Sequence, residues 1–146
     1  MKIQEKALLD KIRGSRLKPI GLVKDSIGVT VDEAWRKIAN FAVEPSVTLP
    51  LRGERTAEHV NTHWRQLARD AGIFSDNETF LITVVTTGSG DLGWVEVQLT
   101  PETDVSRLRD DQDRIEFIAR SHSGHHVCGV TAEEYDYWIV SLPMDE

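Results

Sequence analysis

The sequence has little cysteine and no long apolar run. Cys128 is the single cysteine among 146 residues, so no disulfide can form within the chain, and we expect a reducing compartment. No apolar stretch approaches the roughly 18 residues that span a bilayer. The residues after Met1 also lack the apolar segment of a secretory signal. We therefore expect a cytoplasmic protein without a membrane partner.

Lysine is absent after Lys37, and this absence divides the charge of the chain. Residues 1–72 hold 13 Lys and Arg against 9 Asp and Glu, a net charge of +4. Residues 73–146 hold 4 against 15, a net charge of −11. An acidic half repels nucleic-acid phosphates, so binding to nucleic acid is not expected. The asymmetry indicates an acidic surface for a basic partner, or an acidic face that serves solubility alone.

The strongest structural signal is a β-hairpin over residues 79–100. Its first run is apolar on both faces, which predicts an interior strand covered on both sides. Its second run, from Trp94, alternates apolar and polar residues, which predicts a half-exposed strand. The glycine-rich loop at residues 88–93 also matches G-x-G-x-x-G. A nucleotide site needs a helix next, whereas the alternation after this loop predicts a strand, so the glycines are assigned to a hairpin loop.

The other segments complete an α+β pattern. Helical spacing predicts helices over residues 2–13, 30–41 and 57–70, the second with a Thr30–Glu33 capping box and the third capped by Thr56. Strand candidates are an edge or loop segment 47–51, then 114–120, 127–130 and 135–142; the stretch from residue 131 to 142 also suits a helix. We predict one domain, 1–146, with a mainly antiparallel sheet of four to five strands and two or three helices packed on one face.

Histidines form two clusters that could bind metal. His59 and His63 are spaced i, i+4 on the predicted third helix, which suits two ligands of one ion. The second cluster spans residues 122–128. If Ser123-Gly124 is a two-residue turn, its ligands lie on opposite faces of the hairpin. A metal-dependent enzyme or metal-binding domain that uses His59 and His63 therefore remains an alternative.

No catalytic motif or cofactor signature is present, so we do not expect an enzyme or assign a cofactor. The leading hypothesis is a small acidic binding protein that neutralises a basic protein partner, as an inhibitor or immunity protein does against a toxic nuclease. A structural subunit that forms homo-oligomers through its strand edges is a further alternative. The candidate partner contacts are acidic residues and two tyrosines near the C-terminus: Asp110, Asp111, Asp113, Glu133, Glu134, Tyr135, Asp136 and Tyr137.

Overall fold

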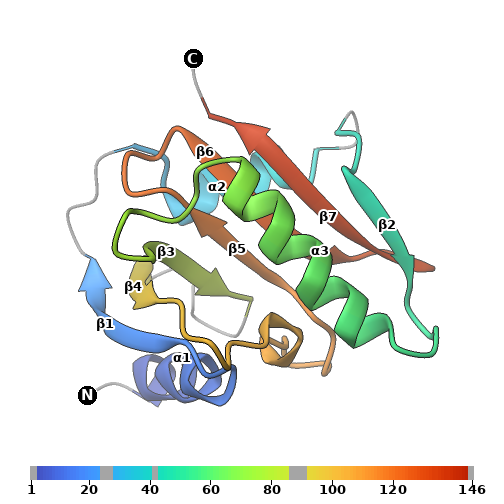
Figure 1. Ribbon diagram of the computed structural model, residues 1–146, viewed down its shortest axis with the longest axis horizontal. Coiled ribbons are helices and arrows are strands. Elements are labelled where there is room, and N and C mark those ends of the chain that lie inside the picture. Colours follow the sequence, from blue (N-terminus) through green and yellow to red (C-terminus); the bar gives the residue numbers. More distant parts are fainter. Residues whose placement is uncertain (1–2, 24–27, 41–42, 86–91, 145–146) are drawn as a thin grey trace.

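The computed structural model describes residues 3–23, 28–40, 43–85 and 92–144 of the chain. Its helices are α1 (Ile3–Gly14), α2 (Val31–Ile38), α3 (Thr56–Asp70) and the 3-10 helix η1 (Val105–Arg107). Its strands are β1 (Lys18–Val23), β2 (Val47–Pro50), β3 (Thr79–Val84), β4 (Trp94–Gln98), β5 (Phe117–Arg120), β6 (His126–Ala132) and β7 (Asp136–Pro143). These strands form one sheet in the order β1-β4-β3-β5-β6-β7-β2, with every neighbouring pair antiparallel (Figure 1).

The α+β class and the antiparallel pairing are confirmed, but the predicted count of four to five strands is wrong. The sheet has seven strands. Pro19 and Gly21 make β1 resemble a connector in the sequence. The strand tolerates both residues because it lies at the edge of the sheet and its register shifts between them. At the opposite edge, β2 ends in Pro50. The ambiguous stretch 131–142 forms the end of β6, a turn at 133–135 and most of β7, and not a helix.

The helices cover both faces of the sheet, so the prediction that they pack on one face is wrong. One core cluster contains Val60 and Trp64 of α3 together with buried residues of α1, and the opposite cluster contains Ile38 of α2. Figure 1 shows α3 in front of the sheet and α2 behind it. Strand β3 serves both clusters, because Ile82 belongs to the first and Leu81 to the second. The two-sided burial predicted for this strand is therefore confirmed.

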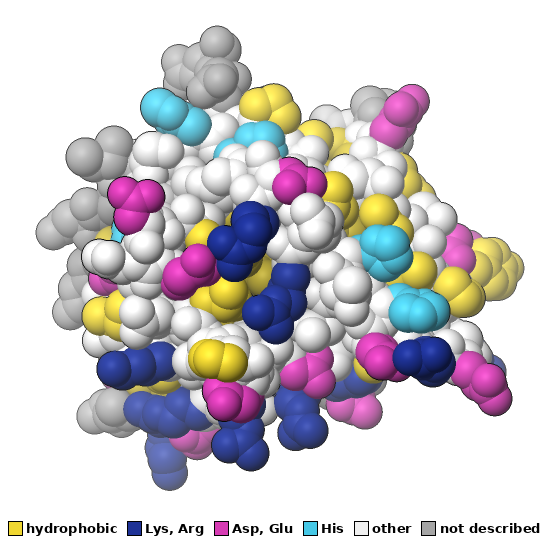
Figure 2. Space-filling view, viewed as in Figure 1, with side chains coloured by type: hydrophobic (Ala, Val, Ile, Leu, Met, Phe, Trp, Pro, Cys, Tyr) yellow, Lys and Arg dark blue, Asp and Glu magenta, His cyan; other side chains and the backbone are white. Residues whose placement is uncertain are grey.

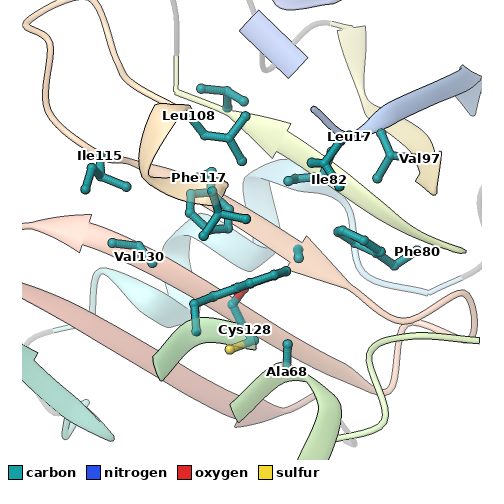
Figure 3. Close-up of a cluster of buried hydrophobic side chains, with 14 of the residues drawn as sticks. Leu17, Ala68, Phe80, Ile82, Val97, Leu108, Ile115, Phe117, Cys128 and Val130 are labelled. Carbon is teal, nitrogen blue, oxygen red and sulfur yellow. The ribbon is translucent and has the colours of Figure 1, made fainter. Parts of the chain in front are cut away.

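Trp64 belongs to the larger of the two clusters, and Figure 3 shows other members, among them Phe80, Phe117 and Cys128. The ring of Trp64 lies 5.7 Å from Phe74, 5.9 Å from Phe80 and 5.3 Å from Phe117, measured between ring centroids. Its indole Nε1 donates a hydrogen bond of 3.0 Å to the carbonyl of Cys128. Because the ring is fully buried and its one donor is satisfied, this contact sets how α3 lies across β6.

The two predicted helix starts have different outcomes. The capping box of α2 is confirmed: Thr30 Oγ1 accepts from the Glu33 N–H at 3.1 Å, and Glu33 Oε1 accepts from the Thr30 N–H at 3.2 Å. Thr56 does not cap α3 as predicted. It is the first helical residue, and its hydroxyl donates to the carbonyl of Pro50 at 2.9 Å, while Arg55 before it has a left-handed φ of 63°.

The predicted hairpin between β5 and β6 is also confirmed. Ala119 pairs with Cys128, and the turn at Ser123-Gly124 is closed by the Gly124 N–H, which donates to the Ser121 carbonyl at 3.0 Å. Gly124 has a φ of 79°, a backbone conformation that favours glycine. A Cβ at this position would also lie 3.0 Å from the Cα of Gly28, so both the backbone conformation and the available space require glycine.

Two further expectations concern membranes and the glycine-rich loop. Among the described helices, none has both the length and the apolar character that a membrane span requires. Most of the loop 88–93 lies outside the described residues. The element that follows it is the strand β4, as predicted, and not the helix that a dinucleotide site needs.

Candidate functional site

The fold brings the two acidic segments of the C-terminal half to one end of the sheet. Loop 109–116 precedes β5, and the turn 133–135 joins β6 to β7. Because β5 and β6 are antiparallel, the start of one lies beside the end of the other. Two hydrogen bonds join the loop to the strand residues on either side of the turn: the Ala132 N–H donates to Glu116 Oε2 at 3.2 Å, and the Ile115 N–H donates to the Tyr137 hydroxyl at 3.1 Å. We call residues 109–116 and 133–136 the acidic end.

The acidic end carries a strong net negative charge. Its two segments contain seven Asp and Glu against two Arg. Figure 2 shows Lys and Arg side chains at the lower left, over α1, others in the centre, over α3, and others at the lower right beside Asp and Glu. The charge asymmetry along the sequence is therefore only in part a separation in space.

The structure divides the predicted partner contacts into exposed and buried residues. Tyr135 is 75% exposed at the tip of its turn, and Asp136 is half-buried. Tyr137 is 5% exposed, because it faces the core, so it cannot serve as the surface anchor that the sequence suggested. The remaining acids on the surface are Asp111, Asp113, Glu133 and Glu134.

Asp110 is likewise a structural residue and not a surface contact. Its side chain is 7% exposed, and its Oδ1 accepts from the backbone N–H groups of Gln112 at 2.8 Å and Arg114 at 3.0 Å. These bonds fold loop 109–116 back on itself, which leaves Asp111 and Asp113 at its outer side. Asp110 therefore shapes the surface that its neighbours present.

Glu116 partners Asp110, although sequence reasoning did not single it out. Burial, together with the hydrogen bond with Asp110, raises the pKa of Glu116 to about 7. Burial also acts to raise the pKa of Asp110, but the hydrogen bonds from Glu116 and from the Arg114 and Gln112 N–H groups hold it below its ordinary value. The proton of the pair thus resides on Glu116. The one signal in the sequence was that Glu116 lies between Ile115 and Phe117, in an alternation that places its side chain on the opposite face of the strand from theirs.

The Asp110–Glu116 pair holds a loop and is not arranged as a catalytic dyad. Both carboxyl groups accept from backbone N–H groups, and Arg114 Nη2 lies 3.5 Å from Asp110 Oδ2 and 3.9 Å from Glu116 Oε1. Each oxygen that binds the backbone is therefore committed to the loop or to the end of β6. We assign the pair to holding the acidic end together.

The two histidine clusters remain separate. His59 and His63 are exposed on α3, whereas the second cluster lies at the β5–β6 turn, where His122 Nε2 is 2.9 Å from Thr79 Oγ1. His126 Nε2 is 2.9 Å from Ser141 Oγ, and Cys128 is buried, which raises the pKa of its thiol to about 12. Within the described ranges, no group of three or more His, Cys, Asp or Glu is placed to hold a metal ion. The two histidine clusters therefore do not combine into one metal site among these residues.

Arg120 is a buried cation that sequence reasoning missed. Its guanidinium donates to the carbonyls of Ser121 at 3.0 Å, Val29 at 2.8 Å and His122 at 2.8 Å, and it lies 5.6 Å from the centroid of the Trp94 ring. Burial lowers its pKa. The side chain ties the β5–β6 turn to the segment before α2, which is a structural role.

A shallow depression of about 300 Å³ lies beside α3 and has a polar lining. The cationic side chains in its wall are already engaged. Arg65 donates to the Thr103 carbonyl at 3.0 Å, and Arg69 binds both carboxylate oxygens of Glu78 at 3.1 Å. We therefore do not treat it as a ligand site.

Comparison with known proteins gives no match to a family model, a curated protein or a solved structure. The candidate site therefore follows from the geometry of this chain alone. It is the exposed part of the acidic end, with the aromatic ring of Tyr135 at its tip and acids on both contributing segments.

Proposed function

We propose that this chain is a small non-catalytic binding protein whose acidic end contacts a basic protein partner. The observation that supports this proposal is the convergence of two acidic segments, distant in sequence, on one end of the sheet through the bonds from Ala132 to Glu116 and from Ile115 to Tyr137. A concentrated negative potential attracts a positively charged partner and increases the rate of association.

Tyr135 supplies the aromatic anchor of the proposed surface. Its side chain is 75% exposed, and its backbone carbonyl accepts from the Leu51 N–H at 3.1 Å, which connects the turn to the residue after β2. Tyrosines held in this way contribute strongly to protein interfaces because little side-chain entropy is lost on binding. An acidic rim around an aromatic tip suits a cationic active site, such as that of a nuclease, and hence an inhibitor or immunity protein.

Two features of the structure favour this proposal over the assembly alternative. The edge strand β1 contains Pro19 and an irregular register, and the edge strand β2 ends in Pro50. Proline cannot donate to a neighbouring strand, so both edges are poorly suited to pairing with another copy. Light scattering is therefore expected to show a monomer over a wide range of concentration.

A charge-reversal experiment tests the proposed surface. The double variant Asp111→Lys and Glu134→Lys changes one exposed acid on each segment of the acidic end. The matched control is Asp76→Lys, an exposed acid in the loop before β3, at the opposite end of the sheet. We expect the native chain and the control to capture the same basic protein from a lysate of the source cells at moderate salt, and the double variant to capture little of it.

The salt dependence of the association rate provides the second measurement. With the captured partner purified, we expect the rate to fall at least about tenfold between 50 and 500 mM salt, because exposed charges are screened. Equal capture by the double variant would contradict the proposal. So would an association rate that does not change with salt.

A further inference from the structure

We propose that His59 and His63 form a two-histidine chelate for a divalent transition-metal ion on the outer surface of α3. The helix is continuous from Thr56 to Asp70, and both histidines are exposed. Residues spaced i, i+4 lie one turn apart on the same face, with Cβ atoms about 5–6 Å from each other. Two imidazole nitrogens can then bind one ion from the same side. This site is independent of the acidic end.

The opposite face of α3 holds the helix in place for this role. Val60 and Trp64 are fully buried in the core, and the indole of Trp64 is bonded to the Cys128 carbonyl at 3.0 Å. The two histidines therefore project from a backbone that is already ordered, so binding an ion does not need to order the helix. Figure 2 shows histidine side chains over the N-terminal half of α3.

The surroundings leave both imidazoles available to an ion. The side chains of His59 and His63 make no hydrogen bond or ion pair with another residue in the part of the chain that the structure describes. Two cations flank the pair in sequence. Arg65, two residues after His63, donates to the Thr103 carbonyl at 3.0 Å. Arg55, four residues before His59, is paired with Glu58 through bonds of 2.7 and 3.0 Å, which reduces its repulsion of a divalent ion.

The donor atoms determine the class of ion. Neutral imidazole is a borderline ligand that suits Zn²⁺, Ni²⁺ and Cu²⁺ at about 2.0–2.1 Å, whereas Mg²⁺ and Ca²⁺ require oxygen donors. No third His, Cys, Asp or Glu joins the pair among the described residues. Water completes the coordination, so the ion binds reversibly and more weakly than in a four-ligand structural site.

The test of this site is a titration of the untagged native chain with Ni²⁺ in a non-chelating buffer, in which calorimetry measures the binding. The decisive variant combines His63→Gln with Gln66→His, so that these two side chains on α3 exchange positions. It keeps all five histidines but moves the pair to a spacing of i, i+7, about 10.5 Å along the helix axis, which is too far for one ion. Gln66 is exposed, so the exchange leaves the core unchanged. The matched control is His125→Ala, which removes an exposed histidine from the other cluster.

We expect one Ni²⁺ per native chain and the same affinity in the His125→Ala control. The exchanged variant should bind at least about tenfold more weakly, because one imidazole alone then holds the ion. Circular dichroism without metal confirms that each variant is folded, and His59→Asn provides a second variant if the exchange disturbs the helix.

Two results would overturn the proposal. One is the absence of Ni²⁺ binding by the native chain up to about 1 mM, a concentration far above that expected for a chelating pair. The other is equal affinity in the native chain and the exchanged variant, which would place the ion on other groups. Neither result bears on the acidic end, because the variants leave Asp111, Glu134 and Tyr135 unchanged.

Discussion

The two ends of the sheet use charges of opposite sign for the same structural task. At the acidic end, Asp110 and Glu116 accept hydrogen bonds from backbone N–H groups. At the other end, which carries the β5–β6 turn, Arg120 donates to three backbone carbonyls. In both places the chain leaves its strand, and polar side chains held in the fold bind the backbone groups of that segment.

The ends differ in how their charges respond to pH. Glu116 has a pKa of about 7, so it gains or loses its proton near neutrality. Arg120 stays protonated over this range, although burial lowers its pKa, because a guanidinium starts from a very high value. The comparison therefore predicts that the contribution of Glu116 to stability changes with pH near neutrality and that the contribution of Arg120 does not.

The largest effect is expected from Arg120→Met. This change removes three hydrogen bonds from a buried charged donor, and each such bond contributes about 1.5–3 kcal/mol. The Val29 carbonyl keeps Trp94 Nε1 at 3.0 Å and the Ser121 carbonyl keeps the Gly124 N–H at 3.0 Å, whereas the His122 carbonyl loses its donor at 2.8 Å. We expect the free energy of unfolding in urea to fall by roughly 3 kcal/mol or more. The control is Arg36→Met, at an exposed residue that pairs with Asp32 at 2.8 Å and should contribute less than about 1 kcal/mol. Similar stability in the two variants would contradict the role given to Arg120.

A smaller loss is expected from Asp110→Ala. The N–H groups of Gln112 and Arg114 lose their acceptor, and Glu116 loses its partner, so we expect a cost of about 2 kcal/mol. Hydrogen exchange should show faster exchange of these two amides than in the native chain. The neighbouring variant Asp111→Ala, on the outer side of the loop, should leave both exchange rates unchanged. Fast exchange in both variants would mean that Asp110 does not hold the loop.

The pH dependence of Glu116 gives the third prediction. Its folded pKa of about 7 lies above the ordinary value of 4.5, so its contribution to stability is complete below pH 4.5 and is lost as the pH rises through 7. Between about pH 5 and 8, the native chain should lose roughly 1–2 kcal/mol more than Glu116→Gln, which has no proton to release. Asp110 does not interfere, because its lowered pKa places its own loss of stability at acidic pH.

Urea unfolding at the two pH values measures this difference. The glutamine keeps a donor for Asp110 and an acceptor for the Ala132 N–H, so it isolates the titration from the contacts. Parallel pH profiles for the native chain and Glu116→Gln would show that the shared proton does not affect folding.

The smallest effect is expected from His122→Ala. His122 lies at the same end as Arg120, with its Nε2 at 2.9 Å from Thr79 Oγ1 and 3.6 Å from Glu96 Oε2, but its side chain is 42% exposed. We expect a loss below about 1 kcal/mol and a shift of the melting temperature of only a few degrees. A loss as large as that of Arg120→Met would move the structural role at this end from the buried cation to the exposed imidazole.

Local patterns predicted the elements whose causes are local. The Thr30–Glu33 capping box, the glycine turn between β5 and β6 and the two-sided burial of β3 each depend on residues within one segment or hairpin. The same reasoning missed β1, because proline and glycine resemble a connector unless the strand is known to lie at an edge. It also assigned Thr56 to a cap, whereas the Pro50 carbonyl engages that hydroxyl.

The sequence predicted which types of residue form the candidate site, but not where the fold places them. Alternation indicates which residues share a face of a strand, but it does not say which end of the sheet two distant loops will share. Asp110 and Tyr137 have the composition of surface contacts, yet one folds a loop and the other faces the core. No sequence motif marks Glu116 or Arg120. Their partners are backbone groups, which every residue carries, so the sequence does not show which of them these side chains bind.

By itself, the sequence determined the α+β class, the antiparallel hairpins, the helix faces and the acidity of the second half. Periodicity, turn residues and composition act over short spans of chain and do not depend on the rest of the fold. Only the tertiary structure decided that α2 lies on one face and α1 and α3 on the other, and that Arg120 reaches the Val29 carbonyl 91 residues away. It also decided that the acidic segments meet. These outcomes depend on the pairing order of seven strands, which sets the neighbours of each buried charge.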